Sequence, residues 1–163
     1  QRRTRGDVDF KRDWTAYRDG FGSVTGDFWL GNEAIHTLTD QVHGPGLRLQ
    51  GPKHANQFFV YISSLYISYR LRLGTISGTH GTVVLAFHNI MAFSTFDRDN
   101  DTHRENCALT HHHGGWWYGA CIRISPNGIW GEKSPQGVSL YTEHTWIYPS
   151  FTELKIRRVK SNT

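Results

Sequence analysis

A short run of alternating acidic residues is the part of this sequence best suited to chemistry. Asp97, Asp99 and Asp101 occupy every second position, so three carboxylates can reach one point from a single loop. Calcium takes six to eight hard oxygen ligands and accepts backbone carbonyls among them. The alternating aspartates therefore predict a calcium loop, and the alternative is a solvated acidic turn without an ion.

The familiar helix–loop–helix calcium site, the EF-hand, does not fit this run. An EF-hand needs a glycine at the sixth loop position and a bidentate glutamate at the last. Counted from Asp97, Thr102 stands at the glycine position and Ala108 at the glutamate position. We therefore expect a calcium loop of another kind.

The two cysteines of the chain, Cys107 and Cys121, follow shortly after the acidic run. Their even number and close spacing favour a disulfide, and two free thiols are the alternative. A bridge over so short a loop would contribute about 3 kcal/mol in the chain-entropy model. A calcium loop beside a small disulfide ring is typical of an extracellular binding module rather than of an intracellular enzyme.

The composition indicates one folded domain without a nucleic-acid or membrane role. Of 163 residues, 37% are hydrophobic and 13% aromatic, which is enough to form a core. The net charge of +4 is mild, and the basic residues form no recognition stripe, so a heparin-like or acidic partner fits better than nucleic acid. No apolar run approaches the roughly 20 residues that span a membrane.

Two short helices are predicted near the start of the chain. Aromatic residues at helical spacing predict the first over residues 9–22, where ordinary core packing explains them. The second should begin at Asn32, a good N-cap residue, with Ile35 and Leu38 facing inward.

Alternating apolar residues predict an antiparallel sheet in most of the remaining chain. The expected strands cover residues 47–50, 59–62, 65–67, 69–73, 82–87 and 151–157. The run 82–87 is β-branched and apolar, which suits a buried strand, whereas the region after Cys121 has little periodicity and should form loops. The expected fold class is α+β, with a loop-rich end that carries the chemistry.

Taken together, these residues resemble the fibrinogen-related domain, the globular C-terminal module of fibrinogens, ficolins, angiopoietins and tenascins. The matching motifs are Val8-Asp9-Phe10, Gly20-Phe21-Gly22, Phe28-Trp29-Leu30-Gly31-Asn32, His88-Asn89, Phe93-Ser94-Thr95, Asp97-Arg98-Asp99-Asn100-Asp101, Asn106-Cys107-Ala108 and Trp116-Trp117-Tyr118. Within the family, the segments 96–101, 137–138 and 151–155 are most similar to tenascins. The resemblance implies a fibrinogen C-terminal-like globe, a twisted antiparallel sheet flanked by short helices.

The resemblance also implies a boundary and a location. Residues 1–163 would form a single fibrinogen-related domain that lacks the family's first small subdomain. No signal peptide is present, so we interpret the chain as a mature or excised fragment. A secreted protein of the extracellular matrix or cell surface is expected.

The calcium ligands follow from the same resemblance. The carboxylates of Asp99 and Asp101 would hold the ion, and backbone carbonyls near His103 and Glu105 would complete the ring with water. Asp97 would lie in an outer shell. The ion's role would be structural, because it neutralises close carboxylates and orders the loop.

In ficolin-like members the region after this loop binds acetyl groups of sugars, and in fibrinogen it takes a peptide amino end. The resemblance places such a pocket around Tyr118, Ala120, Cys121, Trp130, Tyr141 and Trp146, with a cis peptide bond between Ala120 and Cys121. Aromatic rings suit acetyl methyls and sugar faces. Ile122, however, stands where a histidine is usual and offers no side-chain hydrogen-bond donor.

Three further motifs carry weaker signals. Arg5-Gly6-Asp7 spells the integrin-recognition tripeptide, which must protrude on a tight loop to work. His111-His112-His113 suggests a transition metal, but neighbouring histidines on a strand face opposite sides, so a solvated loop is preferred over a zinc hydrolase. Asn100-Asp101-Thr102 matches a glycosylation sequon inside the ion loop.

The main prediction is a calcium-binding recognition module of a secreted glycoprotein, without catalytic activity. It would mediate protein–protein contact and cell adhesion, with integrins or matrix proteins as partners. The alternative is a lectin that binds acetylated sugars through the pocket beside Cys121.

Overall fold

The computed structural model describes residues 1–40, 45–50, 55–77, 81–111, 114–142 and 144–158. The strands are β1 (Arg2–Arg3), β2 (Phe21–Gly22), β3 (Phe28–Trp29), β4 (Pro45–Gln50), β5 (Ala55–Ile62), β6 (Leu71–Ser77), β7 (Ile124–Ser125), β8 (Ser139–Thr142), β9 (Thr145–Ile147) and β10 (Thr152–Arg158). The helices are α1 (Trp14–Asp19), α2 (Asn32–Asp40), the 3₁₀ turn η1 (Leu65–Ile67), α3 (Gly81–Ala86) and α4 (Cys107–Thr110).

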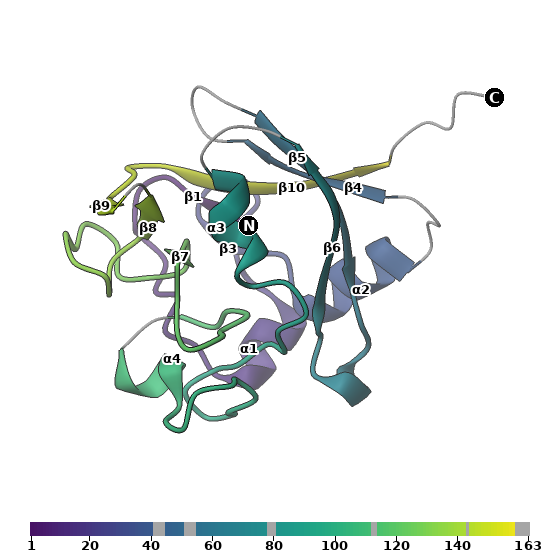
Figure 1. The fold of residues 1–163 in the computed structure, drawn as a ribbon, viewed down its shortest axis with the longest axis horizontal. Helices are drawn as coiled ribbons and strands as arrows, with labels where there is room; N and C mark the ends of the chain where they lie inside the picture. The colour runs from purple at the N-terminus through teal and green to yellow at the C-terminus, as the bar shows by residue number, and fades with distance from the viewer. Residues whose placement is uncertain (41–44, 51–54, 78–80, 112–113, 143, 159–163) are drawn as a thin grey trace.

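Two antiparallel sheets organise these residues. The larger has the strand order β2-β3-β1-β10-β4-β5-β6, and the smaller has the order β7-β8-β9. In Figure 1 the long strands β4, β5 and β6 lie on one side of the molecule, while β7, β8, β9 and α4 lie on the other. The α+β prediction is confirmed, but the region after Cys121 contains short strands where only loops were expected.

Strand β10 lies in the middle of the larger sheet and joins its two parts. It pairs with β1 on one side, where Glu153 faces Arg2, and with β4 on the other, where Leu154 faces Leu49. The alternating pattern of residues 151–157 correctly predicted this strand. Its position makes the sheet depend on contacts between residues far apart in the sequence.

Helix α1 is shorter than the helix predicted over residues 9–22, because local polar groups end it. The Asp13 carboxylate accepts the backbone N–H of Ala16 at 2.8 Å, which caps the helix and leaves Phe10 outside it. At the C-terminal end, the helix stops before Gly20, which has a positive φ of 95°. Phe10 is still buried, and its carbonyl accepts the Tyr17 hydroxyl at 2.7 Å.

Helix α2 begins where it was predicted, but its buried face differs. Ile35 is buried, whereas Leu38, which was expected to face inward, is 46% exposed. The inner position belongs to Thr39, whose hydroxyl accepts the backbone N–H of Ile62 in β5 at 3.3 Å. A polar bond to the sheet therefore helps to set the rotation of α2.

Two of the predicted strands are helical, so those predictions were wrong. Residues 65–67 form η1, and most of residues 82–87 belong to α3. Helix α3 buries Val84 and Leu85, and Phe87, which follows the helix, is on the surface. A short apolar run suits a buried strand and a buried helix segment equally well, so its pattern cannot decide between them.

A cluster of aromatic rings connects α1, the larger sheet and the segment that leads to Cys121. The Tyr17 ring lies 5.4 Å from Trp29 and 5.2 Å from Phe93, and Phe93 lies 5.1 Å from Trp117. A Cβ on Gly115 would approach carbon atoms of Tyr17 and Phe93 to 2.8 Å, so the close packing requires glycine. These contacts hold the loop-rich part of the chain against the sheet.

Ile90 has a left-handed backbone conformation, with φ of 61°, that β-branched residues rarely adopt. Its N–H donates to the Leu71 carbonyl at 2.8 Å, and its side chain is 54% exposed. We expect Ile90→Asn to raise the free energy of unfolding by about 1 kcal/mol, because asparagine tolerates this conformation. Urea unfolding measures the change. Ile90→Val keeps the branched Cβ and should show no gain, and equal gains in both variants would contradict this explanation.

Candidate calcium loop and disulfide

The acidic loop between residues 96 and 106 is held by two asparagines. Asn100 donates its side-chain amide to the Phe93 carbonyl at 2.8 Å. Asn106 donates its amide to the carbonyl of Thr95 at 3.0 Å, close to where the loop begins. The loop therefore returns on itself before α4 starts.

Asp101 is the central carboxylate of this loop. Its two oxygens accept the backbone N–H groups of His103 at 2.8 Å and of Cys107 at 2.9 Å, while Asp99 accepts the N–H of Asp101 at 3.1 Å. Burial raises the pKa of Asp101, and the neighbouring charge of Asp99 raises it further. A cation beside both carboxylates would remove that repulsion. The donor set present at Asp99 and Asp101 thus fits a hard divalent ion.

The other predicted calcium ligands have different surroundings. Asp97 accepts the backbone N–H of Trp14 at 3.0 Å and the hydroxyl of Thr95 at 2.7 Å, so it anchors the loop to α1. The Glu105 carbonyl lies 3.2 Å from Nδ1 of His103. Carbonyl ligation by His103 and Glu105, and an outer-shell role for Asp97, stay predictions.

Cys107 and Cys121 form a disulfide, with an S–S distance of 2.02 Å and Cα atoms 5.6 Å apart. The prediction of a bridge is confirmed. Cys107 is fully buried at the start of α4, which Asn106 caps by accepting the N–H of Leu109 at 2.9 Å. The peptide bond between Ala120 and Cys121 is cis, as the resemblance implied. The disulfide therefore ties the end of the acidic loop to the predicted pocket segment.

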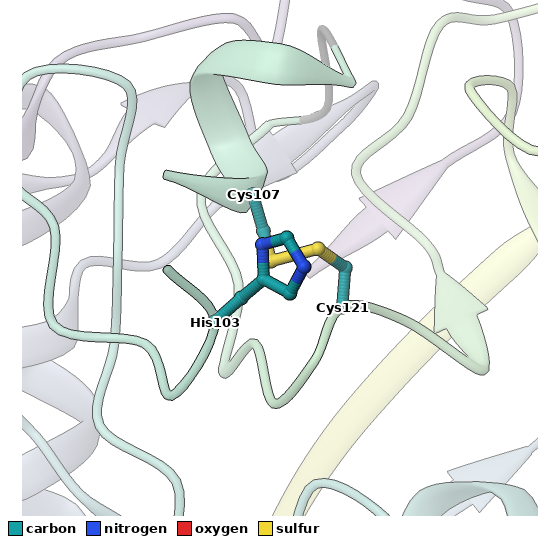
Figure 2. Close-up of side chains that lie close together, drawn as sticks. All are labelled: His103, Cys107 and Cys121. Atoms are coloured by element: carbon teal, nitrogen blue, oxygen red, sulfur yellow. A yellow bond between two sulfur atoms is a disulfide. The ribbon is translucent and has the colours of Figure 1, made fainter. Parts of the chain in front are cut away.

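Sequence reasoning missed the position of the His103 side chain. Figure 2 shows its imidazole beside the disulfide, and a ring nitrogen and the sulfurs of Cys107 and Cys121 lie within 4.8 Å of one another. While the sulfurs are joined they offer no thiolate to a metal. Spacing along the sequence could not reveal this cluster, because it depends on where the fold places Cys121.

The predicted pocket residues next to the disulfide differ in exposure. Tyr118 is fully buried, its hydroxyl donates to the Gly114 carbonyl, and burial raises its pKa well above the usual value. Ala120 is exposed, and Cys121 is half-buried. Ile122 packs against the core. Of these residues, Ala120 is the most accessible to a ligand, whereas Cys121 and Ile122 are both half-buried.

The remaining pocket residues lie in two groups. The Tyr141 and Trp146 rings pair across β8 and β9 with centroids 5.2 Å apart. The Arg123 guanidinium lies 5.3 Å from the Tyr141 ring, a cation–π contact that sequence reasoning missed. Trp130 packs near the amino-terminal strand β1, where the Arg3 guanidinium lies 5.5 Å from the Trp130 ring. The structure thus joins Tyr141 and Trp146 and places Trp130 beside β1.

His88 connects the segments on either side of Cys121. Its Nδ1 donates to the Trp117 carbonyl at 2.7 Å, and its Nε2 accepts the backbone N–H of Arg123 at 3.3 Å. Burial lowers the pKa of His88 to about 4. The ring is therefore neutral at physiological pH, the form that has one donor and one acceptor for these two partners.

The Arg5-Gly6-Asp7 turn rests on the protein surface. The buried Asp27 carboxylate accepts the N–H groups of Arg5 at 3.2 Å and Gly6 at 2.8 Å, and a Cβ on Gly6 would overlap the Trp130 indole. Arg5 and Asp7 are exposed and pair with each other at 3.3 Å. Integrin recognition of this tripeptide stays a prediction, and both charged groups would first have to separate.

We expect Asn100 to carry no glycan, because its amide nitrogen, the attachment atom, already donates to the Phe93 carbonyl. A glycan there would replace one of the two hydrogens on this nitrogen and crowd the acidic loop. Chain secreted from animal cells should keep its mass after treatment with an N-glycosidase. A mass shift that disappears in Asn100→Gln would contradict this prediction.

The histidine run is only partly described. His111 follows α4, and its backbone N–H donates to the Cys107 carbonyl at 3.3 Å. His112 and His113 lie outside the described residues, so the solvated loop expected there stays a prediction. Within the described ranges, no helix is long and apolar enough to cross a membrane.

Comparison with known proteins identifies the family. Residues 1–159 match the family model of the C-terminal globular domain of fibrinogen beta and gamma chains. Angiopoietin-related protein 7 of Mus musculus is 41% identical over 96% of this chain, and tenascin-R of Mus musculus is 38% identical over 96%. The chain spans about half the length of angiopoietin-related protein 7 (49%) and 12% of tenascin-R.

Solved structures agree with this match. The fibrinogen-like globe domain of human ANGPTL6 has a TM-score of 0.86 and 34% identity, over 98% of this chain and 77% of that one. A lamprey fibrin D-dimer complexed with the peptide Gly-His-Arg-Pro-amide has a TM-score of 0.85 and 28% identity, over 99% and 62%. Tenascins are among the relatives, as predicted, together with angiopoietin-related proteins, and these relatives are extracellular or matrix proteins. The chain belongs to the family of fibrinogen C-terminal globular domains.

Proposed function

We propose that this chain is a secreted, calcium-binding recognition domain that contacts other extracellular proteins and has no catalytic role. The observation that carries the proposal is the position of Asp101, whose carboxylate holds the N–H groups of both His103 and Cys107 beside Asp99. An ion on Asp99 and Asp101 would order the acidic loop and, through the disulfide, the segment around Cys121. Calcium would thus shape a surface rather than take part in a reaction.

A protein partner is favoured over an acetylated sugar. Ile122 offers no side-chain donor to an acetyl oxygen, and the Tyr118 hydroxyl is already bonded to the Gly114 carbonyl. Exposed Arg123 and its neighbour Tyr141 are residue types enriched at protein interfaces. The lamprey relative was solved with a peptide ligand, which supports the same class of partner.

The test is attachment of integrin-bearing cells to surfaces coated with the full chain. Because cell receptors need divalent ions themselves, calcium stays constant and the chain is varied instead. We expect Asp101→Asn to reduce attachment strongly, whereas Asp40→Asn, a change at an exposed aspartate at the end of α2, should leave it unchanged. Equal attachment to both variants would refute calcium-dependent adhesion. Retention on acetylated resin with release by free acetate would instead support the lectin alternative.

A further inference from the structure

We propose that the reduced form of this chain binds a soft divalent metal, such as zinc, through His103, Cys107 and Cys121. These residues come from the acidic loop, the start of α4 and the segment before β7, and Figure 2 shows them converging. One ligand atom from each lies within 4.8 Å of the other two. Two thiolates and one imidazole are a zinc ligand set, and three protein ligands leave a fourth position for water.

The backbone already has a suitable geometry for this site. Zinc–sulfur bonds of about 2.3 Å in a tetrahedral arrangement place two sulfurs about 3.8 Å apart. The Cα atoms of Cys107 and Cys121 are 5.6 Å apart. Rotation of the two side chains can therefore open the sulfur pair to that separation without moving the backbone.

The surroundings of His103 suit a metal ligand. Its Nδ1 lies 3.2 Å from the Glu105 carbonyl and 3.3 Å from the Glu105 backbone N–H, and in the tautomer with a protonated Nδ1 it donates to that carbonyl. Metal-bound histidines usually donate their second ring N–H to an acceptor of this kind, which leaves the other nitrogen for the ion. His103 and Cys121 are half-buried, while Cys107 is fully buried. A metal could thus reach the site from solvent past His103 and Cys121, and Cys107 would bind it from the buried side.

The site forms only after the disulfide is reduced. A dithiol reductant transfers two electrons and two protons to the sulfurs and leaves as a disulfide. A phosphine reductant achieves the same with one water molecule, whose oxygen it keeps as the phosphine oxide. Metal binding then releases the two thiol protons, and the neutral imidazole of His103 adds its lone pair. Reduction followed by metal binding thus replaces the disulfide by metal–ligand bonds at the end of the acidic loop.

Cobalt serves as the spectroscopic probe in the test. The full chain is reduced with a phosphine, which avoids competing thiols, and is titrated with Co²⁺ and then with Zn²⁺. We expect a sulfur-to-cobalt charge-transfer band that saturates at one Co²⁺ per chain, which the oxidised chain lacks and Zn²⁺ removes. His103→Ala should weaken binding to the reduced chain by at least the roughly tenfold that loss of an outer partner of a ligand causes.

Two controls distinguish this site from other binding. Alanine at His111, His112 and His113 together removes the histidine run and should leave the band unchanged. Tryptophan fluorescence follows folding of the reduced chain, and zinc should raise the Tm of the reduced wild type more than that of reduced His103→Ala. A charge-transfer band that does not depend on His103, the same band in the oxidised chain, or no band in the reduced chain would each overturn the proposal.

Discussion

Calcium at about 10 mM should raise the Tm of this chain by roughly 3–10 °C, and Asp101→Asn should remove most of that rise. Extracellular calcium modules have Kd values of about 10⁻⁴–10⁻³ M, so this concentration is roughly 10–100 times Kd. A ligand that binds only the folded chain then adds about 1.4–2.7 kcal/mol. For a domain of this size each kcal/mol moves Tm by about 2–4 °C.

The physical reason for the choice of Asp101 is its double role. Its carboxylate would bind the ion and already accepts the N–H groups of His103 and Cys107. The neutral amide has a similar size, but it loses the charge that attracts calcium and can accept only one of these two N–H groups. Asp99→Asn should have a similar effect, whereas Asp40→Asn, at an exposed position in α2, should keep the full rise. An unchanged Tm in the wild type would refute the calcium proposal.

Asp27→Ala should lower the free energy of unfolding by about 3–5 kcal/mol. Asp27 is only 1% exposed and accepts hydrogen bonds from both the N–H and the hydroxyl of Thr4 and from the N–H groups of Arg5 and Gly6. It also lies 4.0 Å from the guanidinium of Arg3, which is 2% exposed. Alanine would leave these donors without their acceptor and would remove a nearby negative charge from the buried Arg3, which still donates to the Gly128 carbonyl at 2.7 Å.

The effect of Asp27 should also depend on pH. Burial alone would raise its pKa, but the hydrogen bonds outweigh burial and hold the pKa below the usual value. A lowered folded-state pKa means that this stabilisation is present above the unfolded-state pKa of about 4. It is lost as pH falls through the folded-state pKa. The difference between wild type and Asp27→Ala should therefore narrow in acid.

Urea unfolding at neutral and acidic pH measures both effects. Asp7→Ala is the matched control, because it removes an exposed aspartate from the same turn and should change stability by less than about 0.5 kcal/mol. A loss below about 1 kcal/mol for Asp27→Ala at neutral pH would show that the turn and Arg3 find other partners. A difference that grows in acid would contradict the lowered pKa.

Local patterns were sufficient for several parts of this protein. The strict alternation of residues 151–157 identified β10, because opposite faces of a strand meet different surroundings. Two close cysteines identified the disulfide. The alternating aspartates predicted the acidic loop, because carboxylates at every second position of a short segment can reach the same point. Each of these features depends on residues near one another in the chain.

Only the tertiary structure determined the rotation of α2 and the helical form of α3. The same holds for which of the predicted pocket residues are buried and which are exposed. Leu38 is exposed because Thr39 bonds to β5, and residues 82–87 have no pattern that separates strand from helix. Such choices are settled by which neighbour an apolar or polar group meets, and those neighbours lie elsewhere in the sequence.

The clusters that carry the proposals likewise needed the fold. His103 meets Cys121 because the disulfide with Cys107 holds that segment close. Asp27 meets Gly6 because β1 pairs with β3. Sequence by itself determined which side chains could bind an ion, form a disulfide or donate a hydrogen bond. Tertiary structure decided which of them face one another, since hydrogen bonds and metal ligation act over a few ångströms and are indifferent to separation along the chain.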